Sequence, residues 1–262
     1  MIKLFNINNY IIDTSKFNNV LNGEIVYKFE NEFAKYVGAK YACGVNSATN
    51  AIFLSLLNKS TEINVPSIIP PVVLNAILLS GNSIKFQDNV DWVGGSYTLK
   101  EFEDYKIIDS AQKVEKNQFK KEANENDLMI FSFYPTKPVG GIDGGIIVSN
   151  DKLKIDWFRK AVMNGTSQTF ESWGRKISFP GWKSYLSSSQ AFVARENLNK
   201  LDAKNKRLTE VLEFNNSSFK TNNDSLHLFR LDVENRSEFI DSMNDKGIIC
   251  GIHYSAMHLN DV

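Results

Sequence analysis

The sequence lacks an excess of charge of either sign and a long apolar run. Its 30 Lys and Arg residues balance its 30 Asp and Glu residues, so no overall field attracts nucleic acid or an anionic membrane. No apolar stretch reaches the roughly 20 residues that a membrane-spanning helix needs. The first six residues, Met1 to Asn6, contain no apolar core of a signal peptide. We therefore expect neither nucleic acid nor a membrane as a partner.

Cysteine and histidine are also scarce. The two cysteines, Cys43 and Cys250, lie far apart in the sequence and match no redox or zinc spacing. His253 and His258 are five positions apart, which fits no zinc pattern. The sequence therefore predicts a cytoplasmic protein with reduced thiols and no metal site.

The composition is that of an ordinary globular protein, with 42% hydrophobic and 23% charged residues over 262 positions. This length allows one substantial core and a small second lobe. Short apolar runs alternate with amphipathic stretches, which is typical of an α/β protein. A polar stretch at Asn215 to Asp224 indicates a boundary between two domains. We predict a large domain over residues 1–215 and a small C-terminal α/β lobe over residues 216–262.

Strands are predicted where short apolar runs end in polar residues, and helices where apolar residues recur at helical spacing. The expected strands are 41–45, 63–65, 83–86, 105–108, 128–133, 146–148, 226–233 and 248–253. The expected helices are 25–37, 48–57, one that ends at residue 79, 152–164, 187–212 and 237–246.

Two of these expected strands carry reactive or hydrogen-bonding side chains at or just after their ends. Strand 105–108 is followed by Asp109 and Gln112, and strand 128–133 contains Ser132 and is followed by Lys137. Taken alone, Lys137 would be a solvated surface lysine and Asp109 a helix cap. Their common position after buried strands favours a binding site instead, because open α/β sheets bind ligands at the carboxyl ends of their strands.

These segments resemble the DegT/DnrJ/StrS family of nucleotide-sugar aminotransferases. That family carries Asp-x-x-Gln/His after one strand, and Phe-Ser-Phe-x-x-x-Lys followed by paired glycines after another. Here the segments are 109–112, 131–137 and 140–145, and residues 44–51, 181–183 and 246–254 match further family segments in the same order. The resemblance covers about Leu21 to His258. It implies an aspartate-aminotransferase-like fold (fold type I) with a mixed, mostly parallel sheet in the large domain.

The resemblance also implies pyridoxal 5′-phosphate (PLP) as the cofactor. Lys137 would hold it as an imine, which requires a fraction of neutral amine, and the freed amine would shuttle the proton. Asp109 would pair with the pyridine nitrogen so that the ring accepts electrons. Gln112 would lie near the ring hydroxyl.

The cofactor phosphate has its own implied set of residues. The amide of Ala48 and the side chain of Thr49 open a helix, whose N-terminus suits a dianion. Ser132 would add a hydroxyl donor. Lys183 would reach the phosphate of the neighbouring subunit, because the family forms homodimers with shared active sites.

The implied reaction moves an amino group, from glutamate as the donor, to a keto group of a nucleotide-linked sugar, in amino-sugar or cell-surface polysaccharide biosynthesis. Lys137 argues against the dehydratases of the family, which have histidine at that position. A PLP-dependent lyase is a weaker alternative. The non-enzyme alternative is a degenerate, regulatory PLP-binding homologue.

Four departures from the family pattern motivate that alternative. Ala48 replaces the usual glycine of the phosphate loop, and Pro70 stands where an aromatic residue usually covers the cofactor ring. The link between Asp88 and Asp109 is too short for the usual additional strand and helix. The family pattern also continues beyond Val262.

We expect Trp182 and Tyr185 to be packing residues, and the paired glycines to serve either a tight turn or ligand contact.

Overall fold

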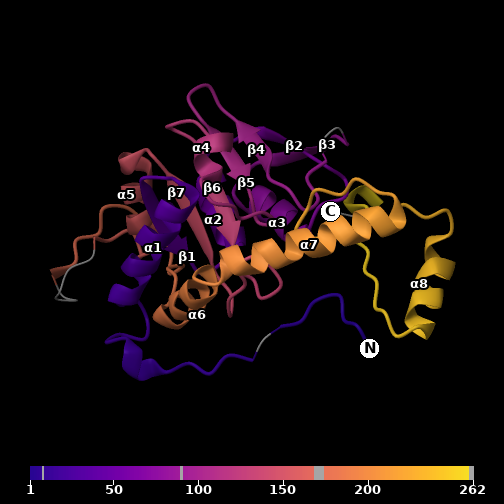
Figure 1. Ribbon diagram of the computed structural model, residues 1–262. Coiled ribbons are helices and arrows are strands. Elements are labelled where there is room, and N and C mark those ends of the chain that lie inside the picture. The colour runs from indigo at the N-terminus through magenta and orange to yellow at the C-terminus, as the bar shows by residue number, and fades with distance from the viewer. Residues whose placement is uncertain (8, 89–90, 168–173, 260–262) are drawn as a thin grey trace.

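The computed structural model describes residues 1–7, 9–88, 91–167 and 174–259, and shows a central sheet with helices on both faces (Figure 1). The main sheet has the strand order β1-β7-β6-β5-β4, and β2 and β3 form a separate parallel pair. The strands are β1 (Tyr41–Val45), β2 (Glu62–Val65), β3 (Ser83–Phe86), β4 (Tyr97–Glu101), β5 (Lys106–Asp109), β6 (Leu128–Ser132) and β7 (Gly145–Ser149).

The helices follow the amphipathic stretches of the sequence. They are α1 (Glu24–Val37), α2 (Ala48–Leu56), α3 (Pro71–Leu79), α4 (Gln118–Glu122), α5 (Lys152–Ala161), α6 (Ser188–Leu198), α7 (Leu201–Phe219) and α8 (Arg236–Asp245), with short 3-10 turns at Thr14–Lys16 and Met257–Leu259. In Figure 1, α7 runs across the front of the molecule and α8 lies at one end, away from the main sheet. None of the helices in the described ranges is long and apolar enough to cross a membrane.

The sheet is mixed, as expected, but it is not mostly parallel. Only the pairing of β5 with β6 is parallel, while β1–β7, β6–β7 and β4–β5 are antiparallel. Three of the five strands, β1, β5 and β6, nevertheless run in the same direction. The reason is that β7 lies between β1 and β6 and runs against both, so each of its two pairings is antiparallel.

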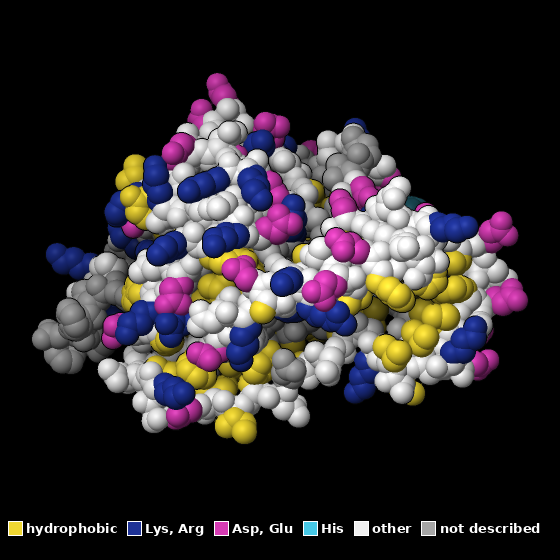
Figure 2. Space-filling view, viewed as in Figure 1, with side chains coloured by type: hydrophobic (Ala, Val, Ile, Leu, Met, Phe, Trp, Pro, Cys, Tyr) yellow, Lys and Arg dark blue, Asp and Glu magenta, His cyan; other side chains and the backbone are white. Residues whose placement is uncertain are grey.

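Alternate residues of the strands enter two separate apolar cores, one on each face of the sheet. In β6, Ile130 joins the core under α2, α3 and α5, whereas Met129 and Phe131 join the core under α1 and α6. This alternation follows from the two-residue period of a strand. Both faces are covered by helices, which explains why these strands read as continuous apolar runs. On the face of the molecule that Figure 2 shows, Lys and Arg are interspersed with Asp and Glu.

Most predicted elements are confirmed, and one strand was missed. The expected strands 41–45 and 83–86 match β1 and β3 at both ends, and Gly38 ends α1 in a left-handed conformation with φ 84°. The link between Asp88 and Asp109 is not featureless, however. It contains β4, an edge strand antiparallel to β5. Tyr97 and Leu99 are the buried residues of this strand, and its charged residues gave it a weak strand pattern.

The C-terminal part differs from the expectation in three places. The predicted helix 187–212 is two helices separated at Asn199 and Lys200, where the amide of Lys200 donates to the carbonyl of Asn197. α7 continues to Phe219, so the predicted boundary at residue 215 lies inside a helix. The predicted strands 226–233 and 248–253 are not formed within the described residues.

The backbone of these two segments has other hydrogen-bond partners. The side chain of Asn223 binds both the amide and the carbonyl of Arg230, at 3.0 and 2.9 Å. Ile2 pairs with Ile248 in a single parallel bridge. These particular backbone groups are therefore satisfied without a sheet. The division into residues 1–215 and 216–262 stays a prediction.

Candidate active site

Six of the seven predicted site residues line one cavity. β5 and β6 are parallel neighbours, so their carboxyl ends meet at one edge of the sheet. Asp109 is the last residue of β5, and Ser132 is the last residue of β6. The chain then turns, with the amide of Lys137 donating to the carbonyl of Tyr134 at 2.9 Å. The resulting cavity, of about 470 Å³, is lined by Ala48, Thr49, Asp109, Gln112, Ser132 and Lys137, among others.

The N-terminus of α2 opens onto the cavity. The side chain of Ser47 accepts a hydrogen bond from the amide of Asn50 at 3.2 Å. This cap leaves the amides of Ala48 and Thr49 at the helix end without an acceptor in the helix, where they suit an anion. Gly145 lets the helix approach β7, because a Cβ there would lie 2.5 Å from the amide nitrogen of Ala48. Gly145 therefore serves close packing of helix and strand, while Gly140 and Gly144 have positive φ angles of 65° and 129°, as the predicted tight turn requires.

Asp109 is a buried carboxylate that is held from two sides. Its side chain accepts hydrogen bonds from the amide of Ala111 at 2.9 Å and from the hydroxyl of Tyr97 at 3.2 Å. Burial raises the pKa of Asp109, while the bond to Ala111 and the positive field of Lys137 oppose this rise. A cationic partner inside the cavity would favour the ionised carboxylate further.

Lys137 is a lysine with a lowered pKa. Burial lowers it by disfavouring the ammonium form, and the negative field of Asp109 partly counteracts this effect. The result is a larger fraction of neutral amine than an exposed lysine has. A neutral amine is what a nucleophile or a general base requires.

Gln112 has a buried hydrogen-bond donor, Nε2, that could bind a ligand. Its Oε1 accepts a hydrogen bond from the amide of Gly94 at 2.6 Å, which fixes the orientation of the side-chain amide. Its Nε2 is buried and forms no hydrogen bond of good geometry among the residues that the structure describes, although a weaker contact of the Gln112 side chain with the hydroxyl of Tyr254 opposes the rise in the pKa of that tyrosine. A buried donor without a partner costs free energy, so this atom indicates a position for an acceptor on a ligand.

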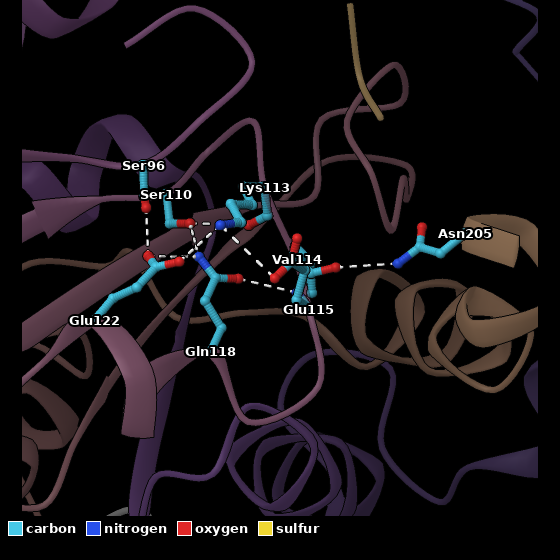
Figure 3. Close-up of polar contacts among 8 residues, drawn as sticks. All are labelled: Ser96, Ser110, Lys113, Val114, Glu115, Gln118, Glu122 and Asn205. Carbon is cyan, nitrogen blue, oxygen red and sulfur yellow. Dashed lines mark hydrogen bonds and ion pairs between the residues drawn. The ribbon is translucent and has the colours of Figure 1, made fainter. Parts of the chain in front are cut away.

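A polar network holds the loop that follows Asp109 (Figure 3). Glu122, from α4, binds Lys113 at 2.8 Å and also accepts hydrogen bonds from Ser96 and Gln118. Gln118 donates in turn to Ser110 at 2.6 Å. On the other side, Asn205 of α7 donates to the carbonyl of Val114 at 3.2 Å, and Glu115 lies 3.7 Å from Lys113. The loop carrying Gln112 is therefore tied to both α4 and α7.

The aromatic wall of the cavity comes from residues to which the sequence interpretation gave no role in the site, although Tyr254 ends a segment that matches the family pattern. Trp92 and Tyr254 stack with their ring centroids 5.9 Å apart and an interplanar angle of 7°. Both line the cavity, together with Tyr97 and Pro70. Trp92 and Tyr97 fall in the stretch predicted to be a short link. A tryptophan in a polar link was the one available signal, because tryptophan is seldom left exposed.

Lys183 is the predicted site residue that the fold does not bring into this cavity. It is exposed, and its backbone forms an isolated antiparallel bridge with Met163. Its neighbours Trp182 and Tyr185 pack against the core under α2, and Trp182 meets Phe53 edge-on at 5.7 Å. Their predicted role as packing residues is confirmed.

The cavity combines the carboxyl group of Asp109, the carboxamide of Gln112 and the lysine Lys137 with the N-terminus of α2. A comparison with known protein families points to the same family that the sequence motifs resemble. The family model for DegT/DnrJ/EryC1/StrS aminotransferases matches residues 5–89 and 106–262. The chain belongs to this family. The unmatched residues 90–105 are the stretch where the sequence departs from the family pattern and where β4 and Trp92 lie.

Two curated relatives illustrate the range of the family. A UDP-4-amino-4,6-dideoxy-N-acetyl-beta-L-altrosamine transaminase of Campylobacter jejuni is 26% identical over 76% of this chain and 63% of its own length. The spore coat polysaccharide biosynthesis protein SpsC of Bacillus subtilis is 25% identical over 91% of this chain and 77% of its own. The chain thus spans less than two thirds of the Campylobacter relative.

The fold is that of solved sugar aminotransferases. The PLP form of Spr1654, a putative sugar aminotransferase of Streptococcus pneumoniae, superimposes with a TM-score of 0.74 at 14% identity, over 98% of this chain and 86% of that one. The expected PLP-type aminotransferase fold is therefore confirmed.

Proposed function

We propose that this chain is a PLP-dependent aminotransferase that transfers an amino group from glutamate to a keto group of a nucleotide-linked sugar. The observation that carries the proposal is the meeting of Asp109, Gln112, Ser132 and Lys137 with the N-terminus of α2 in one cavity. Its role would be in amino-sugar or cell-surface polysaccharide biosynthesis, as the names of the relatives suggest. The free thiols of Cys43 and Cys250 suit the cytoplasm.

The residues of the cavity fit PLP. The buried carboxylate of Asp109 suits a protonated ring nitrogen, and the weakly bonded Nε2 of Gln112 suits the ring hydroxyl. The amides of Ala48 and Thr49, with the hydroxyl of Ser132, supply donors for the phosphate. Ala48 is compatible with this role despite the usual glycine, because its backbone amide is what the phosphate needs.

Each side chain has a defined task. When bound, PLP supplies an aldehyde that links to amines and a ring that accepts electrons from the neighbouring carbon. Lys137 would anchor the aldehyde, and its freed Nζ would take a proton from the α-carbon of the donor. Asp109 would keep the proton on the ring nitrogen. The loop network around Glu122 would hold Gln112 in place, and Trp92 with Tyr254 would exclude water from the ring.

The alternative, a degenerate PLP-binding protein, has one specific observation in its favour. Pro70 lines the cavity at the position where the family usually has an aromatic residue. Trp92 and Tyr254 line the same cavity and provide aromatic surface, so we favour the enzyme.

The half-reaction with glutamate separates the two functions. We expect glutamate alone to convert the bound aldehyde form of the cofactor to the amine form and to release one equivalent of 2-oxoglutarate. Absorbance spectroscopy follows the cofactor, and a coupled assay measures the 2-oxoglutarate. No sugar is required. An unchanged spectrum with glutamate and with other amino donors would favour the degenerate binder.

We also propose a homodimer in which Lys183 serves the cofactor phosphate of the partner. The exposed position of Lys183, outside the cavity of its own chain, supports this role. Mixing Lys137→Ala with Lys183→Ala chains should then restore about one quarter of wild-type activity, because half of the dimers are mixed and each has one intact site. The measurement is activity after subunit exchange, with the dimer content checked by light scattering. Mixed dimers without activity would show that Lys183 acts in its own chain or not at all.

A further inference from the structure

A second cavity, of about 380 Å³, adjoins the cofactor cavity at Lys137. Gln112, Thr136 and Lys137 line both cavities. The other walls of the second cavity come from residues 113–115 of the loop after β5, from α7, from residues 224–227 and from the N-terminal residues 4–6, with Gly94, Pro135 and Pro138 between them. A ligand in this cavity would lie beside the amine of Lys137 without occupying the place of the ring or the phosphate.

Basic groups converge on this second cavity. Lys204 lies at its edge and donates a hydrogen bond to the carbonyl of Pro138 at 2.6 Å, one residue from Lys137. The imidazole of His227 is in the wall, where burial and the positive fields of Lys137, His253 and Lys204 lower its pKa to about 3. Among the described residues, no carboxylate forms an ion pair with Lys137 or Lys204. Lys204 therefore lacks a paired anion, whereas Lys137 has the negative field of Asp109 beside it.

The acidic residues of the wall do not supply that anion. Glu115 lies 3.7 Å from Lys113, and the negative field of Asp224 acts on Arg230. A ligand carboxylate would complete the charge balance of Lys204 and would give the neutral imidazole of His227 an acceptor for its N–H.

The cavity also has an apolar wall that suits a short aliphatic chain. Phe5 stacks on His227 with centroids 5.6 Å apart and an angle of 26°, and it meets His253 edge-on at 6.1 Å. Leu4, Leu208 and Leu226 line the same cavity. This combination of donors and apolar surface matches a carboxylate on a methylene chain better than it matches the hydroxyl groups of a sugar.

We propose that this second cavity binds the carboxylate end of the amino donor, with Lys204 and His227 as its hydrogen-bond donors and Phe5 as the wall for its methylene groups. The proposal rests on the proposed function, because an amino donor would have to bring its amine to the cofactor carbon that Lys137 would hold. It adds a donor subsite whose proposed donors, Lys204 and His227, are not among the residues that would hold the ring and the phosphate.

The test uses glutarate, which has the two carboxylates of glutamate but no amine and therefore cannot react. In calorimetric titrations of the PLP-loaded protein, we expect glutarate to bind and its neutral diamide, glutaramide, not to bind. Lys204→Gln should weaken glutarate binding roughly 10- to 100-fold, as expected for loss of a charged hydrogen bond. His227→Phe, which keeps an aromatic ring against Phe5 but removes the N–H, should weaken it roughly 3- to 10-fold.

The matched control is Lys206→Gln, an exposed lysine two positions further along α7 that does not line the cavity. It should bind glutarate like the wild type. Equal binding of glutarate and glutaramide, or wild-type binding by Lys204→Gln, would overturn the proposal. Because the titration needs no turnover, a protein that binds glutarate through Lys204 but does not convert glutamate would refute the aminotransferase activity and retain the subsite.

Discussion

Replacing Lys137 with alanine should abolish both covalent attachment of PLP and conversion of glutamate, with a loss in the half-reaction rate of at least about 10³-fold. The reason is that one amine performs two tasks, as anchor and as proton carrier, and no second lysine lines the cofactor cavity in the described part of the chain. Borohydride reduction followed by peptide mass mapping should place the phosphopyridoxyl group on Lys137 in the wild type. The variant should carry no such label.

Lys137→Arg is the control for this prediction, since it keeps a positive charge beside Asp109 but has no amine that can be neutral at physiological pH. It should remain folded, bind PLP without a covalent bond and be as inactive as the alanine variant. A label on another lysine of the wild type, or an arginine variant with substantial activity, would refute the assignment.

Asp109→Asn should lower the half-reaction rate by about 10²–10³-fold, because the buried carboxylate is the group that would keep the ring nitrogen protonated. Asparagine can still accept the hydrogen bond from the amide of Ala111, so the loop should keep its conformation. Stopped-flow absorbance would measure the rate. The thermal midpoint of unfolding would show whether the fold is retained.

Tyr97→Phe is the matched control for Asp109. It removes the 3.2 Å hydrogen bond to the carboxylate but leaves the charge, so a loss below about tenfold is expected. If Asp109→Asn keeps a rate within a few fold of the wild type, or if Tyr97→Phe loses as much as Asp109→Asn, the charge of Asp109 is not what the reaction requires.

The main elements of the fold were predictable from the sequence because their signals are local. Gly38 ends α1, Ser47 caps α2, and the apolar runs of β6 and β7 are typical of buried strands. The elements that were missed lack such signals. The charged edge strand β4 gains its partner only in the folded protein, and nothing in the local sequence marks the break between α6 and α7.

The local sequence was enough to predict that the candidate site residues after two strands would meet, because parallel strands such as β5 and β6 must end at the same edge of a sheet. It therefore placed Asp109, Ser132 and Lys137 together. What surrounds them depends on the packing of distant segments. Trp92 stacks on Tyr254, which lies 162 positions later in the sequence, and Phe5 stacks on His227, which lies 222 positions later. Such contacts depend on how whole segments pack against each other, and no local pattern of hydrophobicity or charge encodes that packing.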